Sequence, residues 1–102
     1  MNRDSLRNAV ATGAIEWQRH SLERMMERGI SRDSVKRILL DGELIESYAD
    51  DKPFPSALFL GLLEEKPLHV VAALDEESGM CFIITAYYPD EEHFGPDFRT
   101  RR

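Results

Sequence analysis

The chain has 102 residues, a length that suits one domain built around one hydrophobic core. Hydrophobic residues make up 42% and charged residues 31%, which excludes a disordered chain, and the single cysteine, Cys81, excludes an internal disulfide framework. The longest apolar runs have the length of strands and the N-terminus is charged, so we expect neither a membrane span nor a signal peptide. A cytoplasmic protein is therefore the expectation.

The net charge of −6 argues against a general nucleic-acid coat, because cationic groups carry the affinity for phosphate backbones. The charge is unevenly distributed. Residues 1–37 hold eight Arg and Lys against five acids, a balance of +3, and the remainder holds five against fourteen, a balance of −9. A basic helical region beside an acidic sheet is compatible with local phosphate binding and equally with a partner of mixed charge.

Two helices are expected in the first half of the chain. Residues 1–13 show weak periodicity and predict a frayed or short helical lead-in. The apolar spacing that follows predicts an amphipathic helix over about 14–28, with Trp17 on its apolar side and Gly29 as its stop. Ser31 then caps a second helix that ends at Asp41-Gly42. The two helices predict a helical hairpin over 14–41.

Four strands follow, over 43–48, 56–63, 68–74 and 80–88, separated by proline, glycine and acidic turn signals. A polar tail, 89–102, closes the chain, with Phe94 and Phe98 as anchors. Because helices precede strands, we predict one α+β domain, with the helical hairpin on one face of a four-stranded antiparallel sheet spanning 43–88. The other sheet face is expected to be free for a partner, a substrate or the tail.

His20 and Arg24 stand one helical turn apart beside Trp17. In a functional interpretation, His20 is a general acid or base and Arg24 a clamp for phosphate or carboxylate. In a structural interpretation, both are surface residues, and Arg24 pairs with a glutamate of the same helix. The spacing alone favours the structural interpretation.

His69 lies inside an otherwise apolar strand, either as a core histidine bonded to a backbone carbonyl or facing the open side of the sheet near Thr85 and Tyr87. A plain hairpin pairs His69 with Ala86 and leaves the two hydroxyl residues on the opposite face. A one-residue bulge at Gly79 would bring all three to one face. The sequence leaves both registers open.

No metal site and no cofactor site is predicted. Three histidines and one cysteine lack paired ligand spacing, and no phosphate-binding glycine loop or nucleophile motif is present.

Four segments in this order carry a resemblance to a known family: Trp17–Ser31, Gly42–Tyr48, Leu68–Val71 and Ile83–Asp90. Together they resemble the bacterial domain-of-unknown-function family 4258, over roughly Trp17 to Arg102. That family is similar in helix and strand order to RelE-like and colicin-type ribonuclease toxins, and its members often look like toxins of toxin–antitoxin pairs. The resemblance implies such a fold, a cognate antitoxin and RNA as partners, and His20, Arg24, His69, Thr85 and Tyr87 as site residues. The acidic net charge departs from most ribosome-dependent toxins.

The leading hypothesis is a metal-independent endoribonuclease in which a ribose 2′-OH attacks the adjacent phosphate. His20 or His69 would move protons, Arg24 would stabilise the phosphoryl charge, and Thr85 and Tyr87 would orient it. The alternative is a non-catalytic protein-binding module that uses the open sheet face and the basic helix. Self-association through an exposed strand is a third hypothesis.

Overall fold

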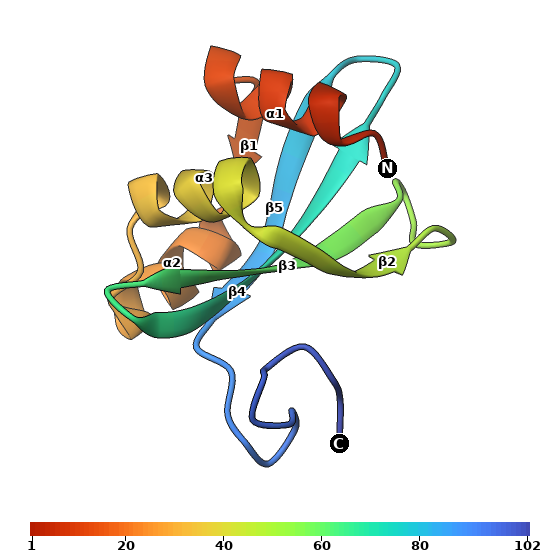
Figure 1. The fold of residues 1–102 in the computed structure, drawn as a ribbon. Coiled ribbons are helices and arrows are strands. Elements are labelled where there is room, and N and C mark those ends of the chain that lie inside the picture. Colours follow the sequence, from red (N-terminus) through yellow and green to blue (C-terminus); the bar gives the residue numbers. More distant parts are fainter.

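Three helices and five strands make up the computed structural model, which describes residues 1–102 (Figure 1). In chain order they are α1 (Arg3–Thr12), β1 (Ile15–Trp17), α2 (Arg19–Arg28), α3 (Arg32–Asp41), β2 (Glu43–Tyr48), β3 (Ser56–Leu63), β4 (Lys66–Asp75) and β5 (Met80–Tyr87). The strands form one sheet in the order β1-β5-β4-β3-β2. The α+β prediction is confirmed.

The predicted four-stranded antiparallel sheet is correct for β2 to β5, which form an antiparallel meander. It is wrong for the whole sheet, because β1 pairs parallel to β5 and makes the sheet five-stranded and mixed. The amide of Cys81 donates to the carbonyl of Ala14 at 2.9 Å where the two strands meet. Strand β1 has three residues, too few to show the alternation of apolar and polar side chains that is typical of a strand. The segment was therefore predicted as part of the helix that follows it.

The helix predicted over 14–28 therefore begins only at Arg19, and Trp17 does not lie on the same helix as His20. The predicted lead-in is a complete ten-residue helix, α1, whose N-terminus is capped by the Asn2 side chain. It ends at Gly13, which adopts a left-handed conformation with φ of 80°. Burial of Leu6, Ala9 and Val10 stabilises this helix despite its weak periodicity.

The main core lies between the sheet and the pair α1 and α3, which cover one sheet face (Figure 1). Val35, Ile38 and Leu39 of α3 are buried there against β3 and β4. Of the predicted hairpin, α3 belongs to the covering layer, and α2 adds only Met25 to the buried core. Instead, α2 lies along β5, where the Ser21 hydroxyl bonds the carbonyls of Ile83 and Ile84, at 3.1 and 2.8 Å.

The tail, residues 89–102, packs on the opposite sheet face, which the sequence left open for a partner, a substrate or the tail. Phe94 is buried there, with its ring 4.5 Å from that of His69 in an edge-on arrangement. The Arg101 guanidinium bonds the Glu46 carboxylate of β2, and Arg99 bonds Glu43. The tail thus covers the part of this face formed by β2, β3 and β4.

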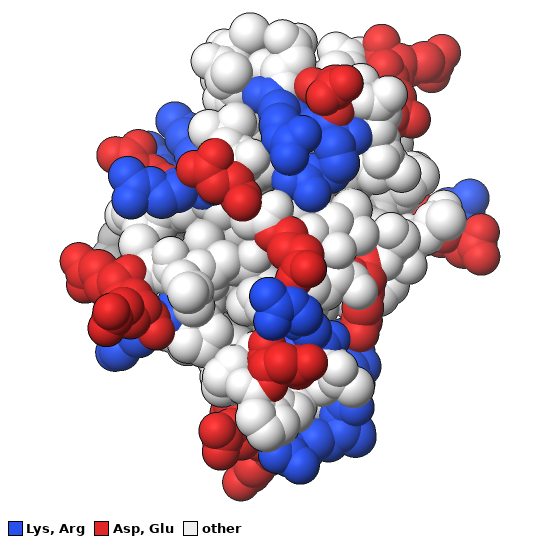
Figure 2. Space-filling model, in the orientation of Figure 1, with Lys and Arg blue, Asp and Glu red and all other residues white.

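Basic and acidic side chains alternate over the face of the molecule seen in Figure 2, and the tail carries both signs. No single broad basic field is present on this face. None of the helices is long and apolar enough to cross a bilayer.

Candidate functional site

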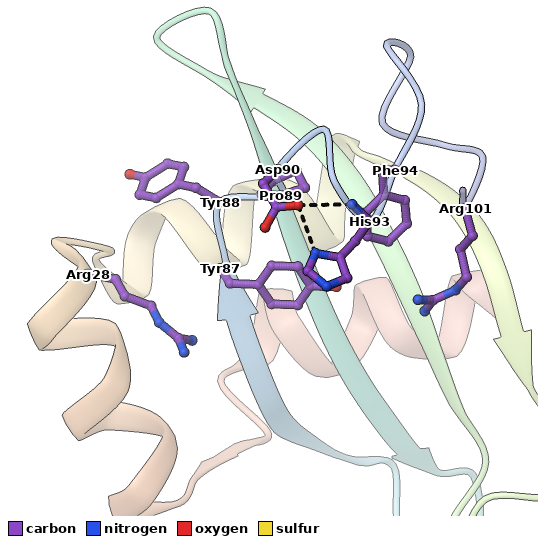
Figure 3. Close-up of a pocket in the computed structure, with 8 residues that line it drawn as sticks. All are labelled: Arg28, Tyr87, Tyr88, Pro89, Asp90, His93, Phe94 and Arg101. Atoms are coloured by element: carbon purple, nitrogen blue, oxygen red, sulfur yellow. Dashed lines mark hydrogen bonds and ion pairs between the residues drawn. The ribbon is translucent and has the colours of Figure 1, made fainter.

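An open hollow of about 510 Å³ lies where β5 ends, between α2 and the tail (Figure 3). Eight residues line it, from α2, from β5 and from the tail: Arg28, Tyr87, Tyr88, Pro89, Asp90, His93, Phe94 and Arg101. The set combines two guanidinium groups, two phenols and an imidazole paired with a carboxylate. These are groups that bind anions and transfer protons.

Arg28 and Arg101 reach the hollow from different elements, and Figure 3 shows their guanidinium groups on either side of Tyr87. Arg28 donates through Nη1 to the carbonyl of Ala86 at 2.9 Å. Arg101 donates through Nε to Glu46 at 2.9 Å and through Nη2 to the Tyr48 hydroxyl at 3.1 Å. These bonds hold each arginine in place. Because a guanidinium has five N–H donors, each arginine also keeps donors free for a ligand.

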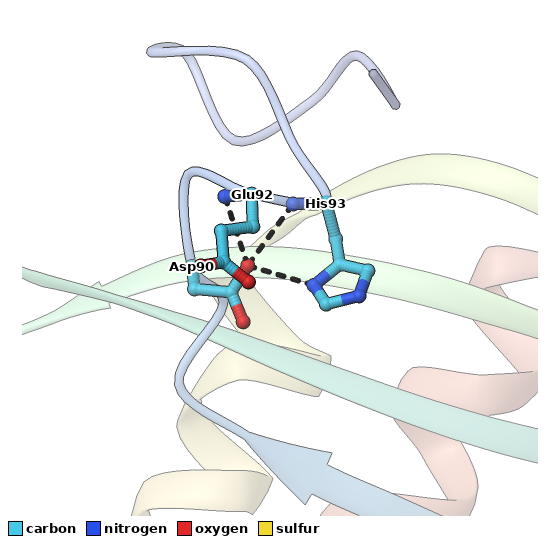
Figure 4. A group of neighbouring side chains, drawn as sticks. All are labelled: Asp90, Glu92 and His93. Carbon is cyan, nitrogen blue, oxygen red and sulfur yellow. Dashed lines mark hydrogen bonds and ion pairs between the residues drawn. The ribbon is translucent and has the colours of Figure 1, made fainter.

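Asp90 and His93 form a pair at the start of the tail (Figure 4). Asp90 Oδ1 accepts hydrogen bonds from the amides of Glu92 and His93, both at 3.0 Å, and from His93 Nδ1 at 2.8 Å. The bond from the His93 side chain, with the amide bonds, holds the pKa of the Asp90 carboxyl below its usual value. This contact fixes Nδ1 of the His93 imidazole as the protonated nitrogen and leaves Nε2 available for proton transfer.

Asp90, Glu92 and His93 are also the residues that could hold a metal ion, since each offers one ligand atom and these atoms lie within 4.8 Å of one another. All three residues are exposed. Asp90 Oδ1 already accepts three hydrogen bonds, so a cation would have to bind its other oxygen.

His69 is fully buried directly behind the hollow. Its Nε2 lies 2.8 Å from the carbonyl of Phe98, which can only accept, so Nε2 carries the hydrogen. Nδ1 then accepts from the Tyr87 hydroxyl at 3.2 Å. Burial lowers the pKa of His69 and raises the pKa of Tyr87, so both side chains are neutral near pH 7. His69 thus positions Tyr87 and does not itself line the hollow.

A β-bulge produces this contact. The β4–β5 hairpin keeps the plain register near its turn, where Asp75 pairs with Met80, but shifts by one residue at Ile84. Beyond the shift His69 pairs with Tyr87 and Val71 with Thr85, so His69, Thr85 and Tyr87 lie on one face. The bulge expected at Gly79 as one of two alternatives lies instead at Ile84.

The other two predicted site residues, His20 and Arg24, are exposed on α2 and do not line the hollow. Thr85 is half-buried and does not line it either, so Tyr87 is the one predicted residue in the wall. His20, Arg24 and Arg28 follow one another at four-residue spacing, which places them in one row along the helix. The row leads to the hollow, and its last member forms part of the wall.

The model of one protein family, described as Domain of unknown function (DUF4258), matches residues 17–88. This chain belongs to the DUF4258 family. No curated protein and no solved structure matches the chain. The family match covers α2 and β5, so Arg28, Tyr87 and Tyr88 lie inside the DUF4258 region, whereas the other five lining residues follow it in the tail.

Sequence reasoning missed Arg28, Asp90, His93 and Arg101 of this DUF4258 protein. Arg28 was detectable, because it extends the His20 and Arg24 spacing by one further turn. The Asp90-x-x-His93 spacing matches a turn in which the aspartate accepts from the histidine backbone, a weak but usable signal. Nothing local indicates Arg101, since its place depends on how the tail folds back to Glu46.

Proposed function

We propose that this protein is a metal-independent endoribonuclease of the toxin type, with the hollow at the end of β5 as its active site. One observation carries the proposal: the Tyr87 phenol and the Asp90-paired imidazole of His93 stand between two guanidinium groups, those of Arg28 and Arg101. This set offers a base, an acid and charge stabilisation for one phosphodiester. The expected likeness to RelE-like and colicin-type toxins suggested this class of reaction, although the mixed five-stranded sheet and third helix depart from the order of two helices and four strands that the likeness implied.

In the proposed reaction, the ribose 2′-oxygen attacks the adjacent phosphorus and the bond from phosphorus to the 5′-oxygen breaks, which leaves a 2′,3′-cyclic phosphate. His93 Nε2 takes the proton of the 2′-hydroxyl. The Tyr87 hydroxyl, whose raised pKa keeps it protonated, turns from His69 Nδ1 to the departing 5′-oxygen and gives it a proton. Arg28 and Arg101 donate to the phosphoryl oxygens, and His20 and Arg24 attract the flanking backbone.

The test is cleavage of a labelled single-stranded RNA by the purified protein in the presence of a chelator. We expect products ending in a 2′,3′-cyclic phosphate and a 5′-hydroxyl. His93→Ala and Tyr87→Phe should each lower the rate by about two to four orders of magnitude, the usual contribution of general acid–base catalysis. Arg28→Met, which keeps the length of the side chain without its charge, should also lower the rate.

His20→Ala is the matched control, since it removes an imidazole that does not line the hollow. We expect it to change the rate by less than about tenfold, as one lost contact to the backbone would. Cleavage by the His93 and Tyr87 variants at the parent rate would overturn this assignment of roles.

A second candidate is a non-catalytic module that binds a protein such as an antitoxin. On the other side of α2, Met26 is 82% exposed beside a shallow hollow formed with Leu22 and Ile30. An exposed apolar side chain of this size suits a protein partner. Absence of both RNA cleavage and growth arrest on expression in bacteria would favour this module over the enzyme.

A further inference from the structure

A second hollow, of about 360 Å³, opens on the same sheet face as the proposed active site. Its walls include Gln18, Lys52, Phe54, Ala73, Phe82 and Ile84. Phe82 pairs with Ala73 and Tyr87 with His69, which places Phe82 and Tyr87 on the face opposite α1 and α3. The two hollows therefore lie near opposite ends of β5, on one side of the sheet.

The second hollow has an aromatic wall. The Phe54 and Phe82 rings are stacked, with their centroids 5.2 Å apart and an interplanar angle of 12°. Ile84 beside them is 41% exposed. Flat apolar surfaces of this kind stack on nucleobases, because every base has a π-face.

Polar groups surround this aromatic wall. Gln18 is the N-cap residue of α2, yet its side chain makes no capping bond, so its amide remains free to bond the edge of a base. Lys52 adds a positive charge to the rim. The Asp51 carboxylate also lines the hollow, but it accepts from the Lys52 amide at 2.9 Å and from the Ser56 hydroxyl at 2.6 Å.

Helix α2 connects the two hollows. Gln18 lies at its start in the second hollow, and Arg28 lies at its end in the first. A rise of about 1.5 Å per residue separates these positions by about 15 Å. Ser21 and Arg28 fasten the helix along β5 through backbone carbonyls. The row of His20, Arg24 and Arg28 therefore runs from one hollow to the other.

We propose that the second hollow is a subsite for an unpaired nucleobase, and that the protein takes single-stranded RNA laid along α2 and β5. The inference rests on the proposed function, in which the first hollow holds the phosphate to be cut. The row of basic groups follows the backbone, while a base a few nucleotides away stacks on Phe54 and Phe82. A duplex cannot present a base in this way, because its bases are paired and stacked inside.

The experiment measures binding of labelled oligoribonucleotides with 2′-O-methyl groups, which lack the attacking hydroxyl and cannot be cut by the proposed reaction. Fluorescence anisotropy is recorded for lengths of two, four and six nucleotides and for a duplex of six pairs. We expect affinity to rise at least about fivefold from the shortest to the longest single strand and to be weaker for the duplex. Phe54→Ala should remove this gain with length and leave binding of the dinucleotide unchanged.

Gln18→Ala provides a second variant, since the lost amide makes no capping bond. It should weaken binding of the longer strands by severalfold. Met26→Ala, which removes an exposed apolar side chain from the other side of α2, is the control and should bind like the parent. Thermal unfolding of each variant checks that the fold is retained.

Affinity that does not depend on length, or a gain with length that survives both Phe54→Ala and Gln18→Ala, would overturn the subsite. These results are independent of cleavage, which is measured separately on unmodified RNA. Cleavage without the Phe54 effect would leave the proposed function standing and reject the subsite. Length-dependent binding without cleavage would reject the enzyme and retain the binding of single-stranded RNA along α2 and β5.

Discussion

Buried His69 positions the half-buried phenol of Tyr87. Its ring bonds the Phe98 carbonyl with one nitrogen and the Tyr87 hydroxyl with the other, so the phenol is held in the wall of the hollow. Burial is the largest influence on the pKa of His69 and lowers it. The Phe98 carbonyl and Glu46 raise this pKa, whereas Arg101 lowers it. The native protein therefore keeps this imidazole neutral at a pH where the unfolded chain would protonate it.

This difference predicts a pH-dependent stability. Above about pH 6.5, the ordinary pKa of histidine, the side chain is neutral in both states and the native contact is fully present. As the pH falls below 6.5, the unfolded chain binds a proton that the native state does not, so the free energy of unfolding decreases. The slope reaches at most about 1.4 kcal/mol per pH unit, for one proton. Urea unfolding between pH 5 and 7.5 measures it, above the range where carboxylates dominate.

His69→Gln should remove this slope between pH 6.5 and 5, because glutamine keeps hydrogen-bonding groups but does not titrate. His20→Asn, which removes an exposed imidazole, is the control and should keep the slope. A slope of equal size in the His69 variant would show that another group causes the pH dependence.

The sequence identified Tyr87 and its neighbour His69 as candidate site residues but did not predict their roles. Alternation along the last strand identified the hydroxyl residues, and the apolar strand around His69 drew attention to the imidazole. The register could not be predicted, because a single extra residue at Ile84 decides it and no local pattern indicates a bulge there. His93 and Arg101 depend on the path of the tail, which follows from tertiary packing.

Helix α2 is held against β5 by a buried hydrogen bond. At the bulge the carbonyls of Ile83 and Ile84 share the single hydrogen of the Ser21 hydroxyl, and the Ser21 side chain is buried. One small polar residue thus fastens the helix to the irregular part of the strand. The row of basic residues and Arg28 depend on this attachment for their position beside the hollow.

Ser21→Ala should lower the free energy of unfolding by about 1–3 kcal/mol, since it leaves bulge carbonyls without their partner. Urea denaturation measures this loss. Ser47→Ala, at an exposed position of β2 whose hydroxyl makes no hydrogen bond, should change stability by less than about 0.5 kcal/mol. Equal stability of Ser21→Ala and the parent protein would mean that the hydroxyl does not anchor α2.

Strong local signals predicted most elements. Ser31 at the start of α3, Gly29 after α2 and the turn signals between strands placed these boundaries within a few residues. Helix α1 was predicted only as a frayed or short lead-in and β1 was missed, and both differences share one cause. Their patterns are weak or short, and they form because α1 packs on the core and β1 pairs with a distant strand, β5.

For the whole molecule, the tail completes the candidate site. It supplies five of the eight lining residues of the hollow, and it lies beyond the residues matched by the family. Its attachment is compact. Phe94 is 3% exposed and packs on His69, its ring lies under Arg101 at 5.0 Å, and Arg101 in turn bonds Glu46. Sheet and tail therefore form the hollow jointly, while the main core lies on the other sheet face.

Phe94→Ala should release the tail without unfolding the sheet, because the lost side chain belongs to the second face and not to the main core. Loss of this buried side chain should lower the free energy of local unfolding of residues 89–102 by about 1.5–3 kcal/mol. Hydrogen exchange followed by mass spectrometry should show faster exchange in this segment and unchanged protection in β3 and β4. RNA cleavage should fall together with tail protection, since His93 and Arg101 leave the hollow. Pro96→Ala, at an exposed position of the same segment, should alter neither measurement, and loss of protection throughout the sheet would show that tail and core unfold as one unit.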